Sequence, residues 1–71
     1  MKVIIVGAGE VGYHIAQKLS RENKDVVLID RGEERLRQVS ESLDVQVLCG
    51  SGASPSLLRE AGVETADMII A

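Results

Sequence analysis

Four short aliphatic runs, separated by polar segments, restrict the fold of this 71-residue chain more than any other feature. They are residues 3–6, 26–29, 45–48 and 68–71. The first two are continuous and rich in the β-branched residues Val and Ile. Such runs are typical of strands that are covered on both faces, as in a parallel sheet.

Helical spacing of apolar residues fills the intervals between the runs. The apolar positions of the first predicted helix are Ala8, Val11, Ile15, Ala16 and Leu19. Those of the second are Leu36, Val39 and Leu43. A third, short helix is predicted after Ser54, which is placed to cap it, with Pro55 at its first position and Gly62 just past its end.

The resulting order, βαβαβαβ, predicts an α/β fold with a Rossmann-like, doubly wound parallel sheet. We expect the strand order 3-2-1-4, with the fourth strand beside the first where the winding direction reverses. A doubly wound domain usually continues beyond this point. We therefore interpret residues 1–71 as a single, truncated domain whose fourth strand has an uncovered edge.

Charge and composition argue against nucleic-acid binding. The chain has 8 Lys+Arg against 11 Asp+Glu, a formal net charge of −3, and Tyr13 is its only aromatic residue. The first apolar run ends at Gly7, too early for a signal peptide, and no stretch approaches the ~20 residues of a membrane span. Because no stretch is long enough to span, we expect no direct insertion into the membrane. The single cysteine, Cys49, cannot form an internal disulfide, so we expect a cytoplasmic protein.

A glycine motif, G-x-G-x-x-G, occupies residues 7–12 between the first predicted strand and the first predicted helix. An acid, Asp30, ends the second strand 18 residues after Gly12. Together these features are the dinucleotide-binding fingerprint. Gly7 would permit the tight turn, Gly9 the approach of a pyrophosphate, and Gly12 the close packing of helix on sheet. The alternative is a glycine-rich turn that binds nothing.

The ribose end of this predicted site centres on Asp30, whose carboxylate would accept hydrogen bonds from the ribose hydroxyls and repel a 2′-phosphate. This predicts a preference for NAD over NADP. Arg31 either stacks on the adenine, tolerates a 2′-phosphate or is simply solvated. The loop 50–52 either lines the adenine end or is a flexible connector. The candidate cofactor-binding residues are Gly7, Ala8, Gly9, Glu10, Val11, Gly12, Asp30, Arg31, Gly50, Ser51 and Gly52.

Catalytic chemistry has no candidate among these residues. Glu10 is interpreted as pointing outward and complementing the helix dipole. Cys49 is interpreted as a small buried apolar side chain rather than a redox-sensitive thiol. His14 is interpreted as a surface histidine, because no partner stands at metal-ligand or triad spacing.

Three segments resemble the RCK (KTN) nucleotide-binding domains of the regulatory subunits of Trk-type potassium uptake systems. Residues 1–12 are similar to the start of these domains. Residues 30–36 are similar to the family's pattern D-x-x-x-x-R-[LV], in which the D is the acid at the end of the second strand and the rest begins a helix. Residues 57–67 are similar to their L-x-x-A-G-[IV]-x-x-A-D signature. Ser51 stands where the family commonly has Asp or Asn. The resemblance covers essentially the whole chain, which corresponds to about the first half of an RCK N-lobe.

The resemblance implies a non-enzymatic regulatory function. Family members are cytoplasmic gating subunits, peripheral to the inner face of the membrane, that associate with a membrane potassium transporter or channel subunit. They bind NAD(H), and in several cases ATP or ADP, and they assemble as dimers or tetramers. Two alternatives stay open: the cofactor-binding half of an NAD-dependent dehydrogenase, and a chain that folds but does not bind nucleotide.

Overall fold

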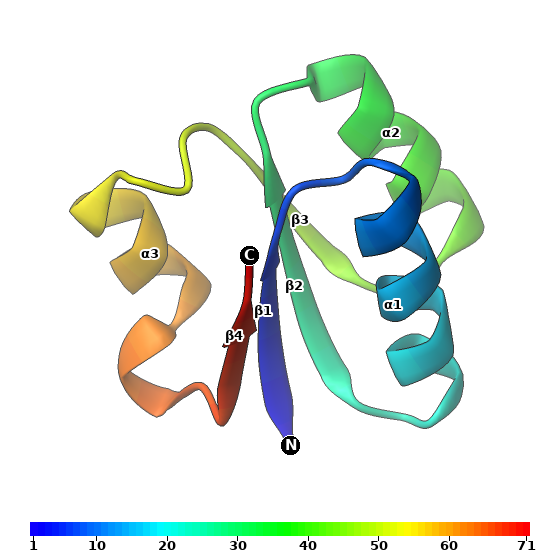
Figure 1. Ribbon diagram of the computed structural model, residues 1–71, viewed down its shortest axis with the longest axis horizontal. Helices are drawn as coiled ribbons and strands as arrows, with labels where there is room; N and C mark the ends of the chain where they lie inside the picture. The colour runs from blue at the N-terminus through cyan, green and yellow to red at the C-terminus, as the bar shows by residue number, and fades with distance from the viewer.

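A computed structural model describes residues 1–71, in which strands and helices alternate (Figure 1). The elements are β1 (Lys2–Val6), α1 (Glu10–Arg21), β2 (Asp25–Asp30), α2 (Glu33–Ser42), β3 (Gln46–Cys49), α3 (Pro55–Ala61), a 3-10 turn η1 (Val63–Thr65) and β4 (Met68–Ile70). The predicted α/β class and element order are therefore confirmed, and only the 3-10 turn was not expected.

The four strands form one parallel sheet in the order β3-β2-β1-β4, which confirms the predicted order. The register places Val6 beside Ile29 and Asp30 beside Cys49. Because the strands are parallel and in register, the loops that follow β1, β2 and β3 emerge at one edge of the sheet, at the top of Figure 1.

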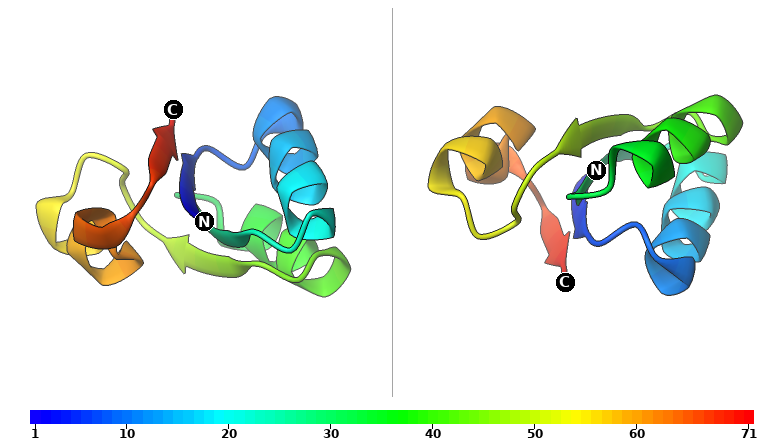
Figure 2. Two further views of the ribbon diagram at one scale, coloured as in Figure 1. Left: turned by 90° about the horizontal axis from the view of Figure 1, so that it is seen from below. Right: turned by 90° about the horizontal axis from the view of Figure 1, so that it is seen from above.

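Helices cover both faces of the sheet, with α1 and α2 on one side and α3 on the other (Figure 2). Alternate residues of each strand therefore enter different cores. On β1, Val3 and Ile5 pack in the core that includes Ala16 of α1 and Leu36 of α2. Ile4 belongs to a second core. Burial on both faces explains why β1 and β2 are continuous apolar runs rather than alternating ones.

The ends of α3 follow the predicted chemistry. The Ser54 hydroxyl accepts a hydrogen bond from the Leu57 N–H at 3.3 Å, and Pro55 occupies the first helical turn. Gly62 ends the helix in the left-handed region with φ 90°. The helix is thus bounded by a side-chain cap at one end and a glycine at the other.

One apolar position of the first helix is exposed, and one prediction of burial was wrong. Val11 is 73% exposed, because it lies in the first turn of α1, while Ala16 is buried and Ile15 and Leu19 pack against the core further along the helix. Cys49 is exposed, because β3 is an edge strand and Cys49 is its last residue.

The opposite edge strand, β4, pairs only with β1. Met68 and Ile69 on this strand are 45% and 49% exposed. Within residues 1–71, β4 is therefore an edge strand, as the predicted strand order implies. None of the helices combines the length and the apolar character needed to cross a bilayer.

Candidate functional site

The glycine loop that joins β1 to α1 makes the tight turn expected from the sequence. Gly7 has a φ of 111°, a backbone conformation that residues other than glycine rarely adopt. Its N–H donates to the carbonyl of Ile29 at 2.7 Å, which fixes the start of the loop against β2. Gly9 is the N-cap of α1, and no side chain caps the helix there. The first N–H groups of α1 thus have no side-chain partner and are available to an anion.

The glycines at positions 9 and 12 differ in the space around them. A Cβ on Gly9 would meet no atom within 4 Å, so this position faces open space. A Cβ on Gly12 would overlap the carbonyl oxygen of Gly7. Gly12 is therefore needed for the packing of α1 on the loop, whereas Gly9 leaves free the space that a pyrophosphate would fill.

Asp30 ends β2 and connects it to the glycine loop through its carboxylate. Oδ1 accepts a hydrogen bond from the Ala8 N–H at 2.9 Å, and Oδ2 accepts one from the Gly32 N–H at 2.8 Å. Nε of Arg35, on α2, lies 3.4 Å from Oδ2. The carboxylate thus contacts the loop after β1 and the start of α2 at once.

The surroundings of Asp30 favour its charged form. Burial raises the pKa of this carboxyl, but the N–H groups of Ala8 and Gly32 and the charge of Arg35 lower it by more, so the pKa lies below the ordinary value of 3.8. A carboxylate has about four lone-pair sites, so these three contacts leave one acceptor site for a ribose hydroxyl. The residues present therefore fit a nucleotide with a free ribose.

The loop after β3 reaches the same edge. The Gly50 N–H donates to the backbone carbonyl of Asp30 at 2.8 Å, and the Arg31 guanidinium donates to the Ser51 hydroxyl at 3.2 Å. Gly52 packs against the side chain of Val6, and a Cβ there would overlap it. The glycine loop, the end of β2 and the loop at 50–52 thus lie together, as predicted. Arg31 and Ser51 are hydrogen-bonded to each other.

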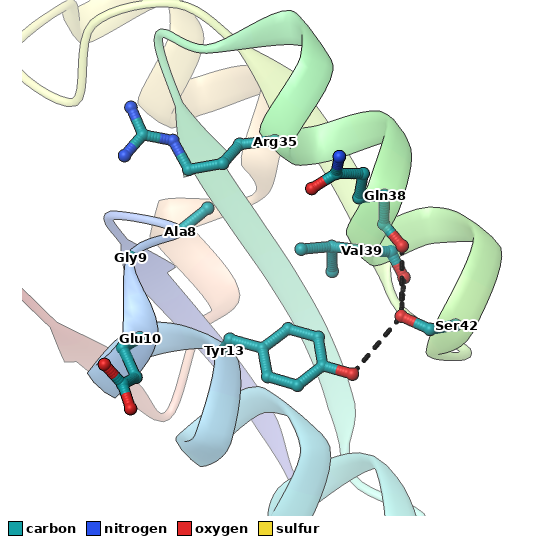
Figure 3. A pocket seen from close by; sticks show the side chains of 8 residues that line it. All are labelled: Ala8, Gly9, Glu10, Tyr13, Arg35, Gln38, Val39 and Ser42. Carbon is teal, nitrogen blue, oxygen red and sulfur yellow. Dashed lines mark hydrogen bonds between the residues drawn. The ribbon is translucent and has the colours of Figure 1, made fainter.

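Two clefts flank the glycine loop. The first, of about 500 Å³, lies between α1 and α2 (Figure 3). Its lining residues are Ala8, Gly9, Glu10, Tyr13, Arg35, Gln38, Val39 and Ser42. The second, of about 310 Å³, lies on the β4 side of the loop and includes the exposed Val11 and Ile70. Gly9 and Glu10 line both, so the loop forms a ridge between them.

Several cleft residues were not among the predicted site residues. In Figure 3 the hydroxyl groups of Tyr13 and Ser42 point toward each other, at 3.3 Å, and Glu10 is turned away from α2. Nothing in the sequence links Tyr13 to Ser42, which are 29 residues apart. Arg35 was present in the D-x-x-x-x-R pattern, but only the structure places its guanidinium against Asp30.

No group of three or more His, Cys, Asp or Glu side chains is placed to hold a metal ion. His14 is exposed, as expected, and packs edge-to-face on Tyr13 with 5.7 Å between ring centroids. The groups gathered at the carboxyl edge of the parallel sheet are backbone N–H groups, the carboxylate of Asp30 and the guanidinium of Arg35 beside it.

A Rossmann-like α/β domain with a glycine loop and an in-register acid is the class that this fold and site define. Comparison with known families gives the particular one: residues 3–71 match the TrkA-N domain, and the chain belongs to this family.

Curated relatives agree with this assignment over the whole chain. The chain is 46% identical to the Trk system potassium uptake protein TrkA of Halomonas elongata and 42% identical to that of Vibrio alginolyticus. It is 48% identical to the Trk system potassium uptake protein TrkA homolog of Archaeoglobus fulgidus. All 71 residues are aligned in each case, and they span 16% of the length of each relative.

Proposed function

We propose that this chain is a nucleotide-binding module that regulates potassium uptake by responding to NAD(H), or alternatively to ATP or ADP. The observation that carries the proposal is the hydrogen bond from the Ala8 N–H to Asp30. It holds the ribose-binding acid against the loop that would bind the pyrophosphate. Family membership supports the potassium role, because the relatives are named as Trk potassium uptake proteins.

The proposed binding mode uses only groups of this chain. The pyrophosphate lies over Gly9, where there is open space, and receives hydrogen bonds from the first N–H groups of α1. The ribose hydroxyls donate to Asp30. Because Asp30 is charged, it favours NADH over NADPH. The other candidates, Val11 and the loop at Gly50 and Ser51, line the two ends of this path.

The proposed partner is a membrane potassium transporter or channel subunit. In this proposal the module is cytoplasmic, is peripheral to the inner face of the membrane through that partner, and acts within a homo-oligomer. A bound nucleotide contacts β1, β2 and α1 together, so binding can alter how these elements pack against a neighbouring subunit. The role is regulatory rather than enzymatic.

Isothermal titration with NADH, NAD, ATP, ADP and NADPH in one buffer tests the proposal. Saturable binding of NADH or an adenine nucleotide, weaker binding of NADPH and no consumption of NADH are expected. Absence of binding by all five would overturn it. Turnover of NADH by the full-length protein would instead favour the dehydrogenase alternative.

A further inference from the structure

The ribose end of the proposed site contains two cations for its one carboxylate. Arg31 follows Asp30 directly, and Arg35 reaches back to Asp30 from the first turn of α2. The repulsion of a 2′-phosphate expected from Asp30 considered alone is therefore opposed by neighbouring positive charge. The two guanidinium groups have different partners, and this difference indicates which arginine lies nearer to the proposed 2′-position of the ribose.

Arg35 contacts Oδ2, one of the two Asp30 oxygens to which a ribose hydroxyl can donate. Its Nε lies 3.4 Å from Oδ2 of Asp30, and its side chain is 59% exposed while that of Asp30 is only 13% exposed. A hydroxyl that donates to Oδ2 at the usual ~2.8 Å lies within about 6 Å of this Nε. Arg31 is instead directed to the Ser51 hydroxyl in the loop after β3.

Gly32 provides the space for this pair. Its φ is −87°, an ordinary value, so the backbone does not require glycine. A Cβ at this position would lie 3.1 Å from Oδ2 of Asp30 and 3.2 Å from both Nε and Nη2 of Arg35. The carboxylate and the guanidinium thus pack over Gly32, and a side chain there would press on both.

Arg35 also belongs to the cleft beside the glycine loop, whereas Asp30 does not line either cleft. Its guanidinium is therefore the charged group of the pair that a ligand in the first cleft meets, and Figure 3 shows it at the glycine-loop end of that cleft. A guanidinium binds phosphate oxygens in a planar, two-pronged geometry.

We propose that Arg35 is a specificity-determining residue of the nucleotide site, which allows the ribose end to tolerate a 2′-phosphate that Asp30 alone would repel. This inference rests on the proposed function. It adds that the preference for NADH over NADPH is moderate in this chain and depends on the side chain at position 35.

The test is a titration of Arg35→Gln and of the unmutated chain with NADH and NADPH. Arg35→Gln removes the charge that faces the 2′-position, so we expect NADPH to bind at least about tenfold more weakly and NADH to change by less than about threefold. Arg37→Gln is the matched control. Arg37 lies on the same helix but pairs with Glu34 and Glu41, so both affinities should stay within about threefold of the original.

A second measurement does not require nucleotide. The Asp30 carboxyl, followed by NMR during acid titration, should have a higher pKa in Arg35→Gln than in Arg37→Gln, because only Arg35 contacts it. An unchanged pKa would show that the pair does not form and would overturn the inference by itself.

The remaining outcomes separate the two proposals. An unchanged ratio of NADPH to NADH affinity in Arg35→Gln overturns the role of Arg35 alone. A change that appears in Arg31→Gln instead assigns the role to Arg31 and also overturns it. Exclusion of NADPH by more than about a hundredfold in the unmutated chain contradicts a moderate preference. Failure of every nucleotide to bind overturns the proposed function, and the inference with it.

Discussion

Two glycines of one motif, Gly9 before α1 and Gly12 in its first turn, differ in what a side chain at each position would meet. Gly9 and Gly12 belong to the same motif, yet a side chain at position 9 enters open space and one at position 12 enters the backbone of Gly7. The sequence motif alone predicted both roles, but it could not show that they are separable. The structure makes the two positions a matched pair.

We therefore expect Gly9→Val to abolish NADH binding and to leave the fold unchanged. A Cβ at position 9 meets no other part of the chain within 4 Å, so the valine would extend into the space proposed for the pyrophosphate. In Gly12→Val, the side chain overlaps the Gly7 carbonyl, so this variant should lose stability. Circular dichroism and titration calorimetry on the same samples provide the measurement. Retained affinity in Gly9→Val would show that the nucleotide does not lie over the loop.

Asp30 is the second position at which we expect one side chain to decide the affinity for nucleotide. Asp30→Ala removes a charge-assisted acceptor, worth roughly 1.5–3 kcal/mol, and should weaken NADH binding by about tenfold or more. Asp25→Ala, at the other end of the same strand, is the control and should bind normally. The measurement is the dissociation constant for NADH of each variant, from titration calorimetry. Equal affinities would remove Asp30 from the site.

At the scale of elements, the alternation of strand and helix was predictable because both faces of the sheet are covered. Continuous apolar runs then mark the central strands, and each interval between them must contain a helix. The same periodicity failed for Val11, because a repeat of four residues does not reveal where a helix begins relative to the sheet. Cys49 was misjudged because the sequence does not show that the strand ending there lies at an edge.

Contacts between elements were less predictable than the elements themselves. Asp30 was predicted as a ligand for ribose, but its carboxylate also joins the glycine loop to α2. Such contacts depend on how the chain turns after each strand, and the spacing of residues along the sequence does not reveal that geometry. The family pattern contained Arg35 without showing its partner.

This link between elements predicts a pH dependence of stability. The pKa of Asp30 in the folded chain is below the ordinary value of 3.8, so the folded state binds this proton less readily than the unfolded chain does. Its contribution is complete above about pH 4 and is lost as the pH falls through the lower, folded pKa. The free energy of unfolding, from urea titrations, should therefore differ between the unmutated chain and Asp30→Asn at pH 7. That difference should shrink towards about pH 3. A difference independent of pH would contradict the assignment.

At the scale of the whole molecule, the two edges of the sheet are unequal. The β3 edge ends in a loop that packs back on Val6, and its exposed residues include the polar Gln46. The β4 edge has the exposed apolar side chains of Met68 and Ile69 beside backbone groups that pair with no further strand of this chain. Unpaired strand edges with apolar side chains favour association with another chain.

We therefore expect the 71-residue chain to self-associate, most simply as a two-fold dimer that buries β4. Ile69→Lys places a charge on this surface, where it would be costly to bury, and should shift the population to monomer without unfolding it, because Ile69 is 49% exposed. Gln46→Lys adds the same charge to the other edge and should leave association unchanged. Light scattering over a concentration series, with circular dichroism of each variant, distinguishes these outcomes. A folded, strictly monomeric chain at high micromolar concentration would show that the exposed edge is tolerated as it stands.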